Sequence, residues 1–209
     1  MDETPAYRAA DIRAAEQPLL DAGAPLMARA AAGLARELRA FDGPLLVLAG
    51  AGNNGGDALF AAAELAAEGR AVRVLVLADR VHEEGLAAAI AAGATRHEVS
   101  EAVALARGAI VVDGILGTGS AGRPALRGTA RAVVEALRPL APTTIAVDLP
   151  SGLDADTGAV PDPAVLRAAV TVTFGAMKAG LRREPGASYA GRVVVIDIGL
   201  DLSAVTPLP

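Results

Sequence analysis

Six short apolar runs between Pro44 and Gly199 constrain the fold of this chain more than any other feature. They are LLVLAG (45–50), VRVLVLAD (72–79), AIVVDGI (109–115), TTIAVDLP (143–150), AVTVTFG (169–175) and RVVVIDIG (192–199). Nearly continuous apolar runs of this length are typical of strands buried on both faces of a parallel sheet. Segments with helical composition separate them, at 56–68, 84–93, 101–107 and 125–137. The alternation predicts right-handed βαβ units in a three-layer α/β/α, Rossmann-like fold with a mostly parallel sheet.

The first part of the chain is expected to be helical. We predict a single domain over 1–209, with a helical N-terminal extension at 1–43 and a Rossmann-like core at 44–200. Pro18 and the turn at 23–25 predict a break between two helices. The second helix carries an apolar residue every three or four positions, namely Leu26, Ala30, Leu34, Leu38 and Phe41. This face is expected to pack on the core or on a second subunit.

Composition excludes several classes of function. Hydrophobic residues make up 53% of the chain but aromatic residues only 2%, which favours helices packed closely on a sheet. The net charge of -5, without a basic stripe, argues against nucleic acid as a partner. The absence of cysteine excludes disulfides and thiolate chemistry and fits a reducing compartment. No apolar run of 18 residues and no secretory h-region is present, so we expect a cytoplasmic protein that does not bind a membrane.

Polar residues follow four of the predicted strands. In an open α/β sheet, ligands bind beyond the carboxyl ends of the strands. The segments at these ends are GAGNNGGD (50–57), DGILGTGSAGR (113–123), DLPSG (148–152) and FGAMKAG (174–180). We expect their polar side chains to converge on one crevice.

The first of these segments, GAGNNG (50–55), matches the dinucleotide-binding pattern G-x-G-x-x-G. Asp79, after the next strand, stands where a ribose-binding acid is expected, so an NAD-dependent oxidoreductase is one hypothesis. Against it, Asp57 would fall in the first helical turn, where its charge would compete with a pyrophosphate. Asn53 and Asn54 present amides suited to hydroxyls, ring amides or a cation. A glycine turn with Asp57 as a helix-stabilising acid remains an equal alternative at this point.

The second glycine loop, GTGSAG (117–122), predicts a better phosphate site. It offers the hydroxyls of Thr118 and Ser120 and is followed by Arg123, with Pro124 placed for the first turn of a helix. Backbone NH groups, hydroxyls and a guanidinium suit a phosphate. The alternative is a flexible connection with a solvated arginine.

Two aspartates, Asp113 and Asp148, each close an apolar strand. A buried hydrogen bond to a neighbouring turn is one reason for a carboxylate in such a position. The other is cation binding, because Asp113 and Asp148 with Asn54 and Ser151 form an oxygen-rich set of the kind that hard cations prefer. A weakly held, partly hydrated cation is expected rather than zinc.

Acid/base chemistry is expected from a carboxylate. His82 and His97 lie in polar segments away from the strand ends, and both are predicted to be surface residues. An unperturbed aspartate has a pKa of about 3.9, so near a cation it would act first as a base. Lys178 is a candidate for a charge contact, although a solvated lysine is the simpler prediction.

The segments GAGNNGGDA, DGILGTG, AVDLPSGLDADTG and TVTFGAMKAGL occur in this order and spacing. With them the chain resembles the YjeF N-terminal domain family, the NAD(P)HX epimerases, from YRAADIRAAEQ to VVVIDIGL. The resemblance implies a Rossmann-like homodimer that interconverts the R and S epimers of NADHX and NADPHX in nicotinamide cofactor repair. Many bacterial relatives are fused to an NAD(P)HX dehydratase, which the resemblance adds as a functional or fused partner.

The resemblance also implies the site residues. Substrate contacts fall on Asn53, Asn54, Gly55, Gly56, Asp57, Gly117, Thr118, Gly119, Ser120, Ala121, Gly122, Arg123 and Asp148. A potassium ion would be bound by Asn54, Asp113 and Ser151, and Asp148 is the expected catalytic acid/base. It would take the proton of the hydroxyl on C6, a hemiaminal carbon, to open the ring reversibly. Loss and return of hydroxide through an iminium is the competing route.

Two other hypotheses remain beside the epimerase. The NAD-dependent oxidoreductase lacks an evident hydride-transfer arrangement built on His or on Tyr and Lys. A non-catalytic nucleotide- or RNA-binding scaffold domain of the same fold is opposed by the acidic net charge and by Asn54, Asp113 and Asp148.

Overall fold

The computed structural model describes residues 4–120 and 122–208. Within them, the main sheet has seven strands, all parallel, in the order β4-β3-β2-β5-β6-β7-β9. The strands are β2 (Leu45–Ala49), β3 (Val72–Val76), β4 (Thr95–Arg96), β5 (Ile110–Gly114), β6 (Thr144–Val147), β7 (Val170–Phe174) and β9 (Arg192–Ile196). Each predicted apolar run contains one of them, and the parallel sheet is confirmed. The two-residue strand β4 was not predicted.

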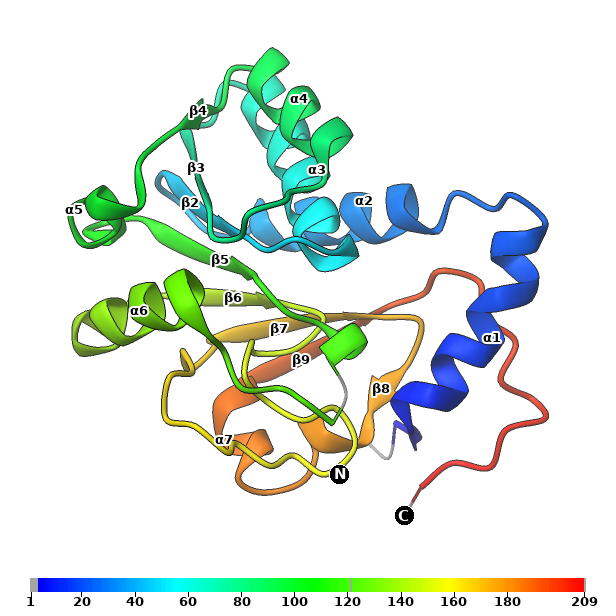
Figure 1. Cartoon of the computed structure of the whole chain (residues 1–209). Coiled ribbons are helices and arrows are strands. Elements are labelled where there is room, and N and C mark those ends of the chain that lie inside the picture. Colours follow the sequence, from blue (N-terminus) through cyan, green and yellow to red (C-terminus); the bar gives the residue numbers. More distant parts are fainter. Residues whose placement is uncertain (1–3, 121, 209) are drawn as a thin grey trace.

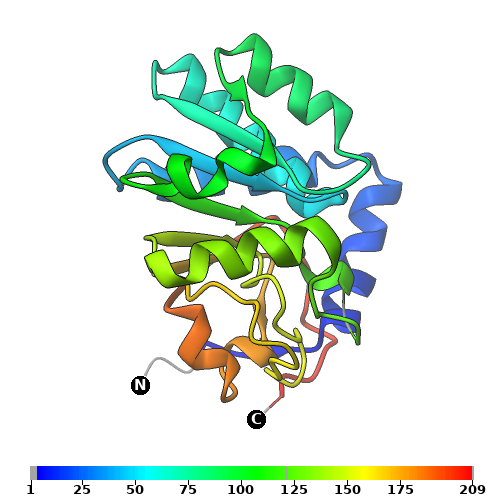
Figure 2. The same cartoon turned by 60° about the vertical axis from the view of Figure 1, so that its left-hand side comes forward.

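Helices cover both faces of this sheet (Figures 1 and 2). One layer contains α2 (Leu26–Leu38), α3 (Asn53–Ala67) and α4 (Glu83–Ala91), and the other contains α5 (Ala102–Ala106) and α6 (Gly128–Leu137). In β2, Leu45 and Val47 pack into the first layer while Leu46 and Leu48 pack into the second. Successive strand residues point to opposite faces, so a strand covered by helices on both faces needs a continuous apolar run. The three-layer α/β/α prediction is confirmed.

The strand order reverses between β2 and β5. From this point the chain moves outward through β3 and β4 on one side, and through β6, β7 and β9 on the other. Connections therefore leave the carboxyl ends of β2 and β5 in opposite directions, and the crevice between them is the usual ligand site of such sheets. The two glycine loops follow these two strands.

The N-terminal region forms part of a second, smaller sheet. Strand β1 (Ala6–Tyr7) pairs in parallel with β8 (Met177–Lys178), and Tyr7 is the partner of Lys178. Helix α1 (Ala9–Asp21) follows and lies apart from both helical layers, at the end of the sheet toward which β5 points (Figure 1). The predicted break between two helices is confirmed, since α1 ends at Asp21 and α2 begins at Leu26, but Pro18 does not mark it, because it lies inside α1, near its end. The chain turns only at Gly23, which has a positive φ of 72°.

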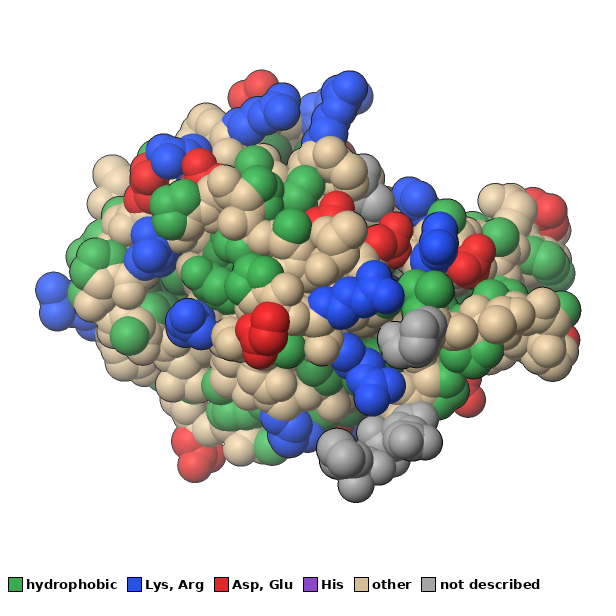
Figure 3. Space-filling view, turned by 90° about the horizontal axis from the view of Figure 1, so that it is seen from below, with side chains coloured by type: hydrophobic (Ala, Val, Ile, Leu, Met, Phe, Trp, Pro, Cys, Tyr) green, Lys and Arg blue, Asp and Glu red, His purple; other side chains and the backbone are tan. Residues whose placement is uncertain are grey.

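The remaining elements are short. They are α7 (Gly186–Ala190) and the 3₁₀ turns η1 (Val99–Glu101), η2 (Thr118–Ser120), η3 (Arg138–Leu140) and η4 (Ala179–Leu181). No helix of the described residues is both long enough and apolar enough to span a membrane. On the face shown in Figure 3, Lys and Arg side chains are interspersed with Asp and Glu.

Candidate functional site

A cavity of about 540 Å³ lies at the carboxyl ends of the strands. Its volume is in the range of sites that bind small molecules and cofactors. Helices α1 and α2, the glycine loops after β2 and β5, and residues after β6, β7 and β9 contribute to its walls. The lining residues are Arg13, Glu16, Leu20, Leu26, Met27, Ala30, Ala51, Gly52, Asn53, Asn54, Asp57, Ile115, Leu116, Gly117, Thr118, Gly119, Ser120, Asp148, Phe174, Lys178 and Ile198.

An ion pair between Asp148 and Lys178 lies in the wall of this cavity. The Lys178 Nζ is 2.7 Å from Asp148 Oδ1 and donates a second hydrogen bond, also of 2.7 Å, to the carbonyl of Phe174. Lys178 is only 2% exposed, so the prediction that it is solvated is wrong. Its backbone is held by the pairing of β8 with β1, which brings the lysine under α1. A buried lysine requires such a partner, because an unpaired charge in the interior is costly.

The backbone at Asp148 is in the left-handed region, with φ at 66°. Few residues other than glycine adopt this conformation, and aspartate is among the more tolerant. Here it ends β6 and turns the carboxylate toward the second glycine loop, where the NH of Thr118 donates to Oδ2 at 2.8 Å. Thr173 donates to the other oxygen, Oδ1, at 3.2 Å. The carboxylate is therefore fixed from three directions.

These contacts keep Asp148 ionised. Burial acts to raise the pKa of its carboxyl group, but the charge of Lys178 and hydrogen bonds from Lys178 and Thr118 outweigh burial. The net effect holds the pKa of Asp148 below its usual range. At neutral pH the group is a buried carboxylate that accepts protons, as a general base must.

Asp57 has the opposite character. Burial raises the pKa of its carboxyl group to about 8, and the nearby charges of Asp148 and Glu16 act in the same direction. Helix α3 begins at Asn53, so Asp57 lies in its second turn. The expectation of a charged acid in the first turn, competing with a pyrophosphate, is therefore wrong on both counts. At neutral pH, Asp57 is mainly a neutral carboxyl group.

Asn54 brings an unpaired amide to the cavity. Its Nδ2 atom is fully buried and has no hydrogen-bond partner among the described residues. A Cβ atom on Gly117 would lie 2.8 Å from Asp148 Oδ2 and 2.9 Å from Asn54 Oδ1. Only a glycine fits between these two side chains. A buried NH₂ group without a partner costs free energy, so a ligand atom that accepts its hydrogen bond is favoured.

Asp113 and Ser151 are bonded to each other behind the cavity wall. The Ser151 hydroxyl donates to Asp113 Oδ1 at 2.6 Å, and the Ser151 NH donates to Oδ2 at 2.9 Å. This is the hydrogen bond to a neighbouring turn that the sequence left open as an alternative. Burial nevertheless raises the pKa of Asp113 against these bonds, and no Lys or Arg of the described residues forms an ion pair with it.

The donor chemistry around Asp113 fits a hard cation. Carboxylate, hydroxyl and amide oxygens come from Asp113, Ser151 and Asn54, and the backbone carbonyl of Asn54 lies beside Gly114 at the end of the same strand. Ions such as potassium prefer oxygen donors of this kind. The described part of the chain has no cluster of three or more His, Asp or Glu side chains suited to a metal.

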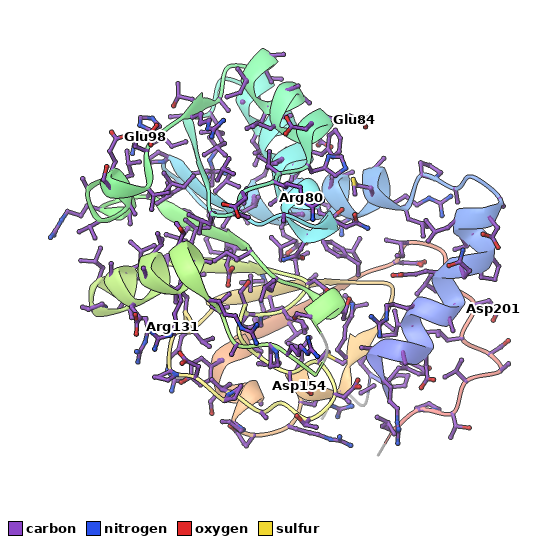
Figure 4. The ribbon with its side chains drawn as sticks, viewed as in Figure 1. Arg80, Glu84, Glu98, Arg131, Asp154 and Asp201 are labelled. Carbon is purple, nitrogen blue, oxygen red and sulfur yellow. The ribbon has the colours of Figure 1, made fainter. Side chains whose placement is uncertain are left out.

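Several polar groups of the second glycine loop are hydrogen-bonded within the described residues. Ser120 donates to the Gly117 carbonyl, and the NH of Gly122 donates to Asp154 Oδ2 at 3.2 Å, beneath the loop in Figure 4. A Cβ atom on Gly119 would meet open space. The prediction that Pro124 occupies the first turn of the following helix is wrong, because α6 begins four residues later at Gly128. Gly117, Thr118, Gly119 and Ser120 of this loop line the cavity.

Helix α1 supplies residues that the sequence did not indicate. Glu16 is half-buried against the cavity, and burial raises the pKa of its carboxyl group, with Lys178 opposing and Asp148 assisting. Arg13 and Leu20 of the same helix line the outer part of the cavity. No motif marks these positions, because they reach the site only through the tertiary placement of α1.

Both histidines are partly exposed, which agrees with the prediction of surface residues. His82 caps α4 by accepting a hydrogen bond from the NH of Gly85, and its ring packs edge-to-face on Phe60. His97 lies 3.3 Å from Glu101. Neither lines the cavity.

The structure brings together most of the expected substrate-binding residues. Those that line the cavity are Asn53, Asn54, Asp57, Gly117, Thr118, Gly119, Ser120 and Asp148. Gly55 and Gly56 at the start of α3, and Gly122 and Arg123 after β5, lie outside its lining. Ala121 falls outside the described residues. Asp79, the ribose-binding acid of the oxidoreductase hypothesis, is exposed and does not line the cavity.

Comparison with known proteins relates the chain to one family. Residues 23–180 match the family described as YjeF-related protein N-terminus. The chain is 61% identical to the NAD(P)H-hydrate epimerase of Clavibacter michiganensis subsp. michiganensis, over 97% of this chain and 94% of the relative. It is 55% identical to that of Microbacterium testaceum, over 94% and 79% of the two chains.

Two further comparisons extend this relationship. The chain is 44% identical to the bifunctional NAD(P)H-hydrate repair enzyme Nnr of Mycobacterium tuberculosis, over 94% of this chain but only 42% of that protein. A crystal structure of the yeast protein YNL200c superposes with a TM-score of 0.74 at 21% identity, covering 91% of this chain and 86% of that one. The latter relationship supports the fold.

Proposed function

The chain belongs to the family of the YjeF-related protein N-terminus and is an isomerase, and from this premise we propose that it interconverts the R and S epimers of NADHX and NADPHX. The observation that carries the proposal is the Asp148 carboxylate, buried in the cavity wall and held ionised by Lys178 and Thr118. Epimerisation at a hemiaminal carbon needs a base and no redox partner, and this carboxylate supplies the base.

The base acts on the hydroxyl of C6 in the hydrated nicotinamide. Asp148 takes the hydroxyl proton, the C6–N bond opens, and closure on the other face of C6 gives the second epimer. The fixed orientation of the carboxylate lowers the entropic cost of proton transfer. Lys178 would stabilise the negative charge of Asp148 before the transfer and between turnovers.

The glycine loops would hold the rest of the dinucleotide. The loop from Gly117 to Ser120 would lie along the phosphates, and the unpaired Asn54 amide would bond to the carboxamide of the nicotinamide. Among the described residues no side chain caps the start of α3, so its first backbone NH groups would add donors for a negatively charged or carbonyl oxygen. The oxidoreductase hypothesis requires a ribose-binding acid that the cavity lacks, since Asp79 lies outside it.

A potassium ion is part of the proposal. Asp113, Ser151 and Asn54 would hold it, and when bound it would offset the buried negative charge of Asp113 and order the strand end beneath the substrate. Asp113 has no cationic side chain as a partner among the described residues, which supports this role. Replacing potassium chloride by tetramethylammonium chloride in the assay is expected to lower the rate.

The assembly of the protein is also proposed. A homodimer is expected from the family, and the Mycobacterium tuberculosis relative is named as a bifunctional repair enzyme. An NAD(P)HX dehydratase, separate or fused, would consume the S epimer that this chain supplies.

The test of the catalytic role is the variant Asp148→Asn. We expect its rate of conversion of purified R-NADHX to the S epimer, followed by chromatography, to fall by about 10²- to 10⁴-fold. Glu135→Gln, an exposed position on α6, is the control and should retain the wild-type rate. Because Asp148→Asn leaves Lys178 unpaired, the double variant Asp148→Asn/Lys178→Gln is measured in parallel. Wild-type activity in a folded form of either would refute the assignment.

A further inference from the structure

Asp57 is a mostly buried carboxyl group in the wall of the cavity. Its residue is 8% exposed, and it lines the same cavity as Asp148. Among the described residues no hydrogen bond or ion pair involves its side chain, whereas Asp113 and Asp148 each accept several. The fully buried polar atom without a partner among the described residues is Asn54 Nδ2, so the Asp57 oxygens keep some access to the cavity. A substrate in the cavity could therefore contact this carboxyl group.

Burial and the acidic neighbours Asp148 and Glu16 oppose the ionisation of Asp57, whereas Lys178 favours it. The titratable and charged side chains that share the cavity with it are Arg13 and Glu16 of α1, Asp148 after β6 and Lys178 of β8. Lys178 is already paired with Asp148. On the other side of α3, His82 packs against Gly56, and Arg29 of α2 donates to the Ile198 carbonyl.

We propose that Asp57 is a second catalytic residue, which as a neutral carboxyl group donates a proton to the ring nitrogen when the C6–N bond of the substrate opens. The inference rests on the proposed function and extends it by separating acid from base. Burial raises the pKa of Asp57 to about 8, which suits an acid. Contacts with Lys178 and Thr118 lower the pKa of Asp148, which suits a base. Two carboxyl groups whose pKa values are shifted in opposite directions within one site are a common acid/base arrangement.

The step balances without an external reactant. The Asp148 carboxylate takes the hydroxyl proton, the oxygen forms a double bond to C6, and the C6–N electron pair moves to nitrogen. The nitrogen takes the proton of Asp57, and the product is an aldehyde with a conjugated enamine. After rotation about the C5–C6 bond, nitrogen attacks the other face, its proton returns to Asp57, and Asp148 returns its proton to oxygen. Both residues then have their starting protonation states.

The test is the pH dependence of the isosteric variant Asp57→Asn. The amide can donate a hydrogen bond as the neutral acid does, but it cannot transfer a proton. For the wild type we expect kcat/KM for R-NADHX to fall above about pH 8, as Asp57 ionises in the free enzyme. For Asp57→Asn we expect kcat to be lower by about 10²-fold, KM to stay within about twofold, and the alkaline decline to disappear. Glu64→Gln, on the same helix but outside the cavity, should keep the wild-type profile.

A measurement that does not depend on catalysis tests the protonation of Asp57 separately from the proposed epimerase activity. A carbon-13 carboxyl resonance that titrates near pH 8 in the wild type and is missing in Asp57→Asn would support the inference and show that the variant folds. An inactive wild type would refute the proposed function, and the inference with it. An active wild type would overturn the inference alone if Asp57→Asn kept the wild-type kcat or the alkaline decline, or raised only KM.

Discussion

Lys178 is the residue on which the charge balance of the cavity depends. Burial of its ammonium group costs free energy, which the ion pair with Asp148 and the bond to the Phe174 carbonyl offset. The same pair holds down the pKa of Asp148. Structure and catalysis therefore depend on the same two atoms, Lys178 Nζ and Asp148 Oδ1.

Replacing Lys178 by methionine should destabilise the fold, because it leaves Asp148 as an unpaired buried carboxylate. We expect the free energy of unfolding in urea at neutral pH to fall by about 3–5 kcal/mol. The double variant Lys178→Met/Asp148→Asn removes both charges and should recover much of this loss. Additive losses in the two single variants and the double variant would contradict the coupling.

Asp57 should make stability decrease with pH. Its pKa in the folded protein, about 8, lies above the ordinary value of 3.8, so the folded state binds the extra proton. The resulting stability is complete below the ordinary value and is lost as pH rises to about 8, by up to about 1.4 kcal/mol per pH unit. Relative to Asp57→Asn, the wild type should therefore lose stability between pH 5 and pH 8 on the order of this slope. A pH-independent difference in urea unfolding would contradict the buried neutral acid.

These two residues show where the sequence stops being informative. Asp148 and Asn54 could be predicted as site residues, because each follows an apolar strand at the edge where ligands bind. Lys178 was predicted to be solvated, and its burial depends on the pairing of β8 with β1. The raised pKa of Asp57 depends first on its burial and then on Asp148 and Glu16, which are distant in sequence. Neither property leaves a local pattern.

At the scale of elements, the site is formed by segments that meet beyond the carboxyl ends of the strands. The long strands were predictable because their apolar runs match burial on two faces. Two-residue strands such as β1 and β8 carry too few residues for any periodicity. Helix α1 was predicted to exist, but its position over the cavity was not, since a charged helix with a weak apolar face can pack in several places.

The variant Gly117→Ala tests how closely the loop after β5 packs against Asp148 and Asn54. A Cβ atom there would press on both Asp148 Oδ2 and Asn54 Oδ1, each less than 3 Å away. We expect kcat/KM to fall by about 100-fold through displacement of these groups, with a smaller effect on stability. Gly119→Ala, two residues on and facing open space, is the matched control for stability. Equal melting temperatures and equal activity for Gly117→Ala and the wild type would contradict the packing.

At the scale of the whole molecule, the reversal of strand order between β2 and β5 brings the parts of the site together. It places both glycine loops, Asp148 and the N-terminal helix around one cavity. The acidic side chains in its wall are Glu16, Asp57 and Asp148, and the basic ones are Lys178 and Arg13. The family relationship covers nearly the whole chain at 61% identity to one epimerase. This cavity is therefore the proposed site at which hydrated nicotinamide cofactors are epimerised.

The most direct test supplies purified R-NADHX together with a dehydratase specific for the S epimer, in potassium buffer. NADH recovery is followed with and without the protein. We predict that the protein makes the whole R pool available, so that NADH is recovered at a rate proportional to its concentration. Recovery no faster than the spontaneous epimerisation of R-NADHX, with folded protein and active dehydratase present, would contradict the account.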